Sequence, residues 1–140
     1  MANSRIARLF LASSVALVAL AIAGCGGPLG GESEEDSAGD TLTELVEARN
    51  QGEFGTVCDL LSAQDLARFD KAGISCEQTL RRRFPTGTTT TIRIEEVRVK
   101  DDRASIDATV SQTGGAGRAQ TFLLIKEDGR WKFPLQQSGG

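Results

Sequence analysis

The sequence predicts an α+β domain in which N-terminal helices pack on a curved antiparallel sheet of four to five strands. Three observations support this prediction. Apolar residues recur at helical spacing from Leu42 to Phe84, and β-branched alternation begins at Thr86. The pair Asp128-Gly129, which lies between two apolar runs, is typical of a β-hairpin turn. Helices followed by strands, and not alternating with them, indicate an α+β arrangement.

The first 25 residues are typical of a bacterial lipoprotein leader. Arg5 and Arg8 precede an uncharged apolar run over residues 9–23, which is too short for a comfortable membrane span. The motif Ile22-Ala23-Gly24-Cys25 resembles the bacterial lipobox, whose cysteine takes up diacylglycerol and becomes the new N-terminus. We therefore predict a signal peptide over residues 1–24, covalent diacylglycerol on Cys25, and a location at the outer face of the bacterial cytoplasmic membrane. A membrane helix with an incidental cysteine is the alternative.

Residues 25–40 are expected to form the lipidated cysteine and a flexible acidic linker. Gly, Ser and acidic side chains dominate this segment, so it offers little apolar surface whose burial would offset the entropy of ordering it. Residues 41–136 are then the folded domain, and residues 137–140 are expected to be a disordered tail.

Four helical segments are expected between Asp40 and Pro85. The first is predicted to begin at the capping box Thr41-Leu42-Thr43-Glu44, with Asp40 as a second cap candidate, and to end near Gly52. The second presents an apolar face at helical spacing, formed by Phe54, Val57, Cys58 and Leu61. The starts and ends of the third and fourth are marked by Ser62, Gly73, Ser75 and Pro85.

Cys58 and Cys76 each lie on the apolar side of a predicted helix. Because the leader indicates export, these cysteines are expected to meet an oxidising compartment, in which disulfides persist. We predict a disulfide that joins the second helix to the fourth, with two buried free thiols as the alternative. A metal site is not expected, because two cysteines without His or a second cysteine pair do not make a zinc site.

The second half of the chain predicts strands separated by turns. Apolar parity reverses across Glu95-Glu96, which predicts a bulge or bend, and Asp101-Asp102 is a plausible turn. The next strand is expected to place Ala104, Ile106, Ala108 and Val110 on one face. Residues 122–125 are apolar at every position, which predicts a central strand covered on both faces. Residues 113–117 are interpreted as a turn, since they lack the Lys-Ser/Thr of a phosphate-binding loop.

The composition excludes several kinds of chemistry. The chain has no His and no Tyr, which rules out imidazole triads and dyads, His-containing zinc sites and phenol donors. Its formal net charge is −3, which argues against a nucleic-acid partner. The cluster Arg81-Arg82-Arg83 complements the dipole at a helix C-terminus, and contact with anionic lipid or cell-wall polymer is the alternative. No cofactor is expected beyond the lipid on Cys25.

The chain resembles the nuclear transport factor 2-like superfamily over residues 41–135. The resemblance rests on the helix at residues 42–48, the segment at residues 52–61 and the ending Glu127-Asp128-Gly129-Arg130-Trp131-Lys132-Phe133. The chain is also similar to small exported actinobacterial lipoproteins with this fold and a paired cysteine. This resemblance implies a cone of helices and curved sheet around an internal cavity. Enzymes of the superfamily use a carboxylate base with Tyr or His partners, and those partners are absent here.

The leading functional hypothesis is a non-enzymatic, lipid-anchored binding or interaction domain whose ligand the sequence does not identify, with a small hydrophobic molecule as one candidate. The residues expected to line its cavity are Ile106, Ala108, Phe122, Leu124, Trp131 and Phe133. The alternative for each of them is that it simply fills the core.

Two other functions compete with ligand binding. One is an enzyme with a buried carboxylate base, for which Asp107, Glu95 and Glu96 are the candidates. The other is a structural homodimer, or a module that docks on an envelope protein through the outer face of the sheet.

The lipid anchor can be tested directly at Cys25. Cys25→Ser removes the thiol that accepts lipid, so we expect loss of incorporated fatty-acid analogue and release of the protein from the membrane fraction. A Cys25→Ser chain that still partitions into membranes would contradict the lipoprotein interpretation.

Overall fold

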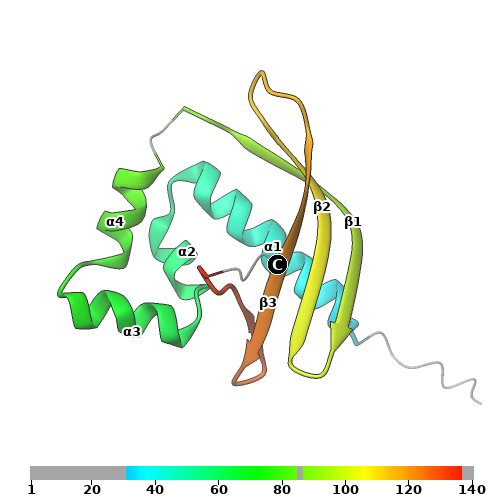
Figure 1. Ribbon diagram of the computed structural model, residues 1–140, viewed down its shortest axis with the longest axis horizontal. Coiled ribbons are helices and arrows are strands. Elements are labelled where there is room, and N and C mark those ends of the chain that lie inside the picture. The colour runs from blue at the N-terminus through cyan, green and yellow to red at the C-terminus, as the bar shows by residue number, and fades with distance from the viewer. Residues whose placement is uncertain (1–30, 85–86, 137–140) are drawn as a thin grey trace, which may run out of the picture. The chain divides into compact units, whose positions relative to one another are not determined.

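The computed structural model describes residues 31–84 and 87–136, which form four helices followed by a four-stranded antiparallel sheet (Figure 1). The helices are α1 (Glu34–Gln51), α2 (Phe54–Asp59), α3 (Ala63–Ala72) and α4 (Cys76–Arg83). The strands are β1 (Thr90–Lys100), β2 (Arg103–Gln112), β3 (Arg118–Glu127) and β4 (Arg130–Lys132), in the spatial order β1-β2-β3-β4. The predicted fold class is confirmed. Within the described residues, no helix combines the length and the apolar character that crossing a membrane requires.

Helix α1 begins earlier than the sequence predicts. Its N-cap is Ser33, whose hydroxyl accepts a hydrogen bond of 3.1 Å from the backbone N–H of Asp36. Acidic side chains fill the first turn, where they complement the positive end of the helix dipole. The predicted start at Thr41 is therefore wrong, and the part of the expected linker from Glu34 to Asp40 is helical. Thr41 lies inside the helix, and its hydroxyl donates to the carbonyl oxygen of Ser37.

Two small residues allow α1 to lie close to the sheet. Ala38 is fully buried, and the position of a Cβ built on Gly39 lies 3.6 Å from a side-chain atom of Ile94 and 3.8 Å from one of Val97. These apolar contacts explain why the segment is ordered in spite of its polar composition. Leu42, one turn further along, is also fully buried.

The other helices follow their predicted boundaries closely. Ser62 and Ser75 are the N-caps of α3 and α4, and Gly73 ends α3 in the left-handed conformation with φ 64°. The predicted disulfide is confirmed: Cys58 in α2 is bonded to Cys76 in α4, with their Cα atoms 6.2 Å apart. Because this bond closes the loop that contains α3, it holds all three short helices in one group.

The sheet is bent at the predicted position. The β1–β2 register shifts between Ile94 and Glu96, which is the irregularity that the parity change predicts. The Asp128-Gly129 turn is also confirmed, with φ values of 50° and 76°. Residues 122–125, however, are not covered on both faces, because Leu123 is 37% exposed. The helices pack on one face of the sheet only, and Leu123 points to the other.

The chain end ties the sheet to the helices. After β4, Phe133 donates its N–H to the carbonyl oxygen of Leu60 at 2.7 Å, and Ser62 donates its N–H to the carbonyl oxygen of Phe133 at 3.1 Å. The backbone thus pairs in parallel with the segment between α2 and α3. This pairing brings the C-terminal segment against α3.

Two glycines, one inside α1 and one at its C-cap, test the boundaries of this helix in opposite directions. Gly39→Ala adds only ordinary van der Waals contacts and removes a flexible residue from a helix interior, so it should stabilise the fold by about 1 kcal/mol. Gly52→Ala should destabilise it by about 1 kcal/mol, because Gly52 has φ 75°. Urea unfolding measures both changes, and no gain for Gly39→Ala would contradict a helix that begins at Glu34.

Candidate functional site

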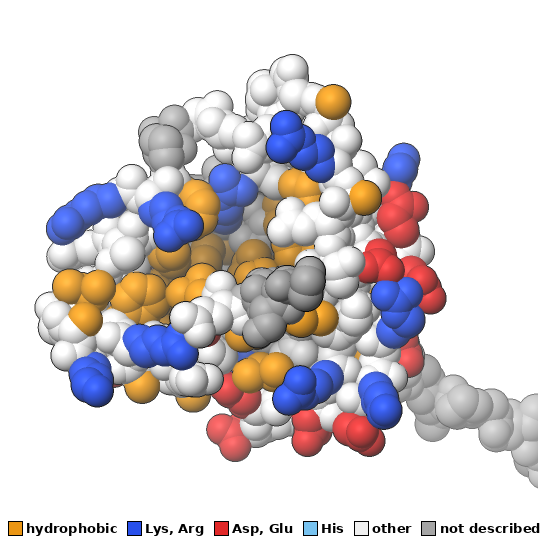
Figure 2. Space-filling model, viewed as in Figure 1, with side chains coloured by type: hydrophobic (Ala, Val, Ile, Leu, Met, Phe, Trp, Pro, Cys, Tyr) orange, Lys and Arg blue, Asp and Glu red, His pale blue; other side chains and the backbone are white. Residues whose placement is uncertain are grey.

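The helices and the inner face of the sheet border an open cavity at the C-terminal end of α1. Its volume is about 450 Å³, within the range of small-molecule sites. The hydrophobic side chains that line it are Leu45, Val46, Phe84, Ile92, Val110, Phe122 and Phe133. The polar ones are Arg49, Arg83, Thr90, Gln112 and Gln120. Figure 2 shows hydrophobic side chains within the hollow between the helices and the sheet. The walls are therefore mainly apolar, with a few polar groups.

Two of the six predicted lining residues lie in this wall. Phe122 and Phe133 line the cavity, and their ring centroids are 6.0 Å apart. The other four are buried in a core cluster together with Ala38 and Leu42 of α1: Ile106, Ala108, Leu124 and Trp131. The unexpected first turns of α1 cover this part of the sheet, so side chains fill the space that the prediction left for a ligand.

Arg49 is the most distinctive polar group of the cavity. It lies in the last turn of α1, and its Nη1 donates a hydrogen bond of 2.6 Å to the hydroxyl of Thr90 at the start of β1. Its guanidinium carbon lies 4.5 Å from the ring centroid of Phe84. Burial lowers the pKa of Arg49, because it removes water from the charged form. No carboxylate pairs with this guanidinium within the described residues.

The backbone at Thr90 is held from α1 by a second side chain. Asn50 accepts a hydrogen bond of 2.9 Å from the Thr90 N–H and donates one of 2.7 Å to its carbonyl oxygen. Thr90 is only 4% exposed, so these bonds satisfy buried backbone groups. The pair thereby aligns the hydroxyl that Arg49 contacts.

The carboxylates proposed as catalytic bases lie on the opposite face of the sheet. Asp107 accepts hydrogen bonds from Thr121 at 2.6 Å and from Arg98 at 2.7 Å, and these donors lower its pKa. Glu95 accepts bonds from Arg93 and Thr109, which also lower its pKa. A general base of an enzyme needs a pKa raised towards neutrality.

No described carboxylate lines the cavity beside Arg49. Glu96 is bonded to Arg98 on the exposed face. Within residues 31–84 and 87–136, moreover, no three Cys, Asp or Glu side chains are placed to hold a metal ion. The arrangement suits binding of an apolar molecule, and it brings no acid–base pair to that molecule.

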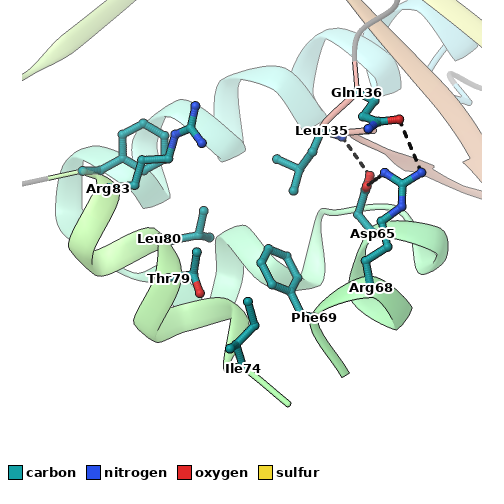
Figure 3. A pocket seen from close by; sticks show the side chains of 10 residues that line it. Asp65, Arg68, Phe69, Ile74, Thr79, Leu80, Arg83, Leu135 and Gln136 are labelled. Atoms are coloured by element: carbon teal, nitrogen blue, oxygen red, sulfur yellow. Dashed lines mark hydrogen bonds and ion pairs between the residues drawn. The ribbon is translucent and has the colours of Figure 1, made fainter. Parts of the chain in front are cut away.

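A second hollow lies between α3, α4 and the C-terminal segment (Figure 3). We call it the α3–α4 groove; its apolar lining is formed by Phe69, Ile74, Leu80, Phe84 and Leu135. At one end the buried Asp65 accepts hydrogen bonds from the hydroxyl of Ser62 at 2.7 Å and from the N–H of Leu135 at 2.8 Å. Asp65 also pairs with Arg68 at 3.1 Å. This carboxylate therefore attaches the chain end to α3.

The groove and the cavity meet at the end of α4. Arg83 and Phe84 line both hollows. The sequence places Arg83 in a helix-end cluster and Phe84 at the end of the apolar helical pattern, and it assigns neither of them, nor Arg49, to a cavity. Each becomes part of a wall only when α1, α4 and the sheet assemble.

Comparisons with known proteins identify solved structures but no family. No family model matches the chain, and no curated protein matches it. One similar solved structure is a Campylobacter jejuni protein named as an NTF2-like transpeptidase, at 18% identity and TM-score 0.46. The similarity covers 71% of this chain and all of that one. Another is a designed NTF2 chain at 13% identity and TM-score 0.46, covering 72% of this chain and 95% of the other.

The outward carboxylates give a pH prediction. We expect the pKa of Asp107 in the folded protein to lie below its ordinary value, and Arg98→Gln to raise it by removing one donor. The stabilising contribution of these bonds is then present at neutral pH and is lost as the pH falls through the lowered pKa. Carboxyl NMR titration measures both values. A pKa of Asp107 raised towards 7 would restore the enzyme hypothesis.

Proposed function

We propose that this protein is a lipid-anchored binding domain, held at the outer face of the bacterial cytoplasmic membrane, that takes up a small and largely apolar ligand without converting it. The observation that carries the proposal is the cavity of about 450 Å³, whose walls are mainly apolar and include no carboxylate among the described residues. Sites of this kind bind ligands by burying apolar surface, and their few polar groups orient the ligand.

The anchor is supported by the sequence of the leader. Cys25 follows an apolar run and two small residues, and only seven residues lie between it and Ser33, the N-cap of α1. The cavity lies at the C-terminal end of α1, beside Arg49 and Thr90.

The side chains that line the cavity support binding of the ligand without a chemical reaction. The polar groups of the cavity are guanidinium, amide and hydroxyl groups, and none of these accepts a proton readily at neutral pH. Asp65 is the one buried carboxylate in the part of the chain that the structure describes, and it is engaged by Ser62, Arg68 and Leu135. Its bonds explain its burial without a catalytic role.

A dimer through the outer face of the sheet has less support. On that face Arg93 pairs with Glu95 within β1, and Arg98 pairs with Asp107 across β1 and β2. Such exposed pairs are well solvated, and burying them in an interface would cost desolvation energy. The mainly apolar surface of the cavity makes ligand binding the better-supported function.

Filling the cavity tests the proposal. Val110 lines it from β2, so Val110→Trp should occupy space that a ligand needs and abolish the fluorescence increase of the neutral probe Nile red. Ala119→Trp is the matched control, because Ala119 is exposed on the next strand and is not part of the lining. Thermal unfolding by circular dichroism verifies that both variants fold. Equal probe binding by Val110→Trp and the parent chain would contradict the proposal.

A further inference from the structure

We infer that the ligand of this cavity carries an anionic head group on an apolar chain, and that Arg49 and Arg83 bind the head group. The shared chemistry is a carboxylate or phosphate attached to a single alkyl or acyl chain. The inference rests on the proposed function and goes beyond it by assigning the charge of the ligand and the residues that recognise it.

The first argument is the unused hydrogen-bonding capacity of Arg49. A guanidinium has five N–H donors, and Arg49 uses Nη1 for its bond to Thr90 within the described residues. One face of the group packs on the ring of Phe84. A partly buried cation with free donors and no carboxylate partner is an unfavourable arrangement that an anion would relieve.

The second argument is the position of Arg83 over the same cavity. Arg83 is the last residue of α4, and its side chain makes no hydrogen bond or ion pair within the described residues. Two guanidiniums thus border one cavity with no acid in its lining. Gln112 and Gln120 add neutral amide donors to the wall. A carboxylate or phosphate is the chemical group that such a set of donors recognises.

The acids of the domain lie mostly away from this cavity. Arg68 pairs with the buried Asp65, and Arg93 and Arg98 pair with carboxylates on the exposed face of the sheet. Figure 2 shows the acidic side chains gathered at the lower and right margins of that view, away from the hollow. The acids that neutralise these three arginines are therefore not part of the cavity wall.

The apolar chain of the ligand is assigned to the cavity and not to the α3–α4 groove. Arg83 borders both hollows, but Arg49 lines the cavity and not the groove. A head group that contacts both guanidiniums therefore places its chain against Ile92, Val110 and Phe122. The phenyl ring of Phe84, fixed beside Arg49, then lies next to the junction of head and chain.

Arg49 also has a structural role, because its bond to Thr90 connects α1 to β1. That role predicts a loss of stability on substitution and no change in preference between charged and neutral ligands. Head-group recognition predicts a change in that preference. Arg83 separates the two roles most clearly, since it makes no bond whose loss would weaken the fold.

Isothermal titration with ligands of one chain length tests the inference. The protein is the full chain with Cys25→Ser, which removes the predicted lipid acceptor and leaves every residue of the domain unchanged. The probes, used below their micellar concentrations, are dodecanoate, dodecyl phosphate, neutral dodecanol and cationic dodecyltrimethylammonium. We expect at least one anion to bind about tenfold or more tightly than dodecanol, as charge-assisted hydrogen bonds would provide. The stronger of the two anions identifies the head group as a fatty-acid carboxylate or a lipid phosphate.

Three variants and one matched control locate the head group and the chain. Arg83→Gln and Arg49→Gln should each weaken anion binding by about tenfold and leave dodecanol binding unchanged. Arg82→Gln is the matched control, because Arg82 neighbours Arg83 in α4 and lines neither hollow. Ile74→Gln in the α3–α4 groove should leave all four affinities unchanged.

The outcomes that would overturn the inference differ from those that would overturn the proposed function. If dodecanol binds as tightly as both anions, the cavity binds apolar molecules without head-group recognition, and only this inference fails. If none of the four probes binds, the proposed function fails as well. If Ile74→Gln weakens anion binding and Val110→Trp does not, the chain occupies the groove and the assignment to the cavity is wrong.

Discussion

The packing of α1 against the inner face of the sheet is the contact on which the rest of the domain depends. Ala38 and Leu42 are fully buried near one end of the helix, and Asn50 holds the backbone of Thr90 at the other. Small side chains allow close approach in the first half, whereas larger and more polar ones occupy the last turns. The helix therefore fills one end of the interior and leaves a cavity at the other.

The disulfide positions α4, whose C-terminal end forms a second wall of this cavity. Cys58 in α2 and Cys76 in α4 join two short helices, neither of which would be stable alone. The bond holds α4 where its last residue, Arg83, and the following Phe84 border the cavity. Arg49 then stacks on Phe84, so the stability of the helical group and the electrostatics of the cavity depend on the same few contacts. A ligand site can thus form in a domain whose helices are mostly short.

The charged side chains differ between the exposed face of the sheet and the cavity on its inner face. Arg98 bonds both Glu96 and Asp107 on the exposed face of the sheet, which leaves these groups solvated and paired. The guanidinium of Arg49 is partly withdrawn from water and lacks an acidic partner among the described residues. A charge costs more in such surroundings than at the surface. An external anion would therefore stabilise the domain more by pairing with Arg49 in the cavity than by binding to the exposed face of the sheet, where the charges are already paired.

Features that depend only on neighbouring residues could be predicted before the fold was known. Ser62, Ser75 and Gly73 delimit helices through local hydrogen bonds and backbone conformation, and Asp128-Gly129 favours its turn for the same reason. The tertiary structure alone decided where α1 begins, because Ala38 and Gly39 look like linker residues until the sheet buries them. The tertiary structure also determines which side chains line the cavity. Alternation along a strand predicts which side chains face inwards, but only the packed helix determines which of those it covers.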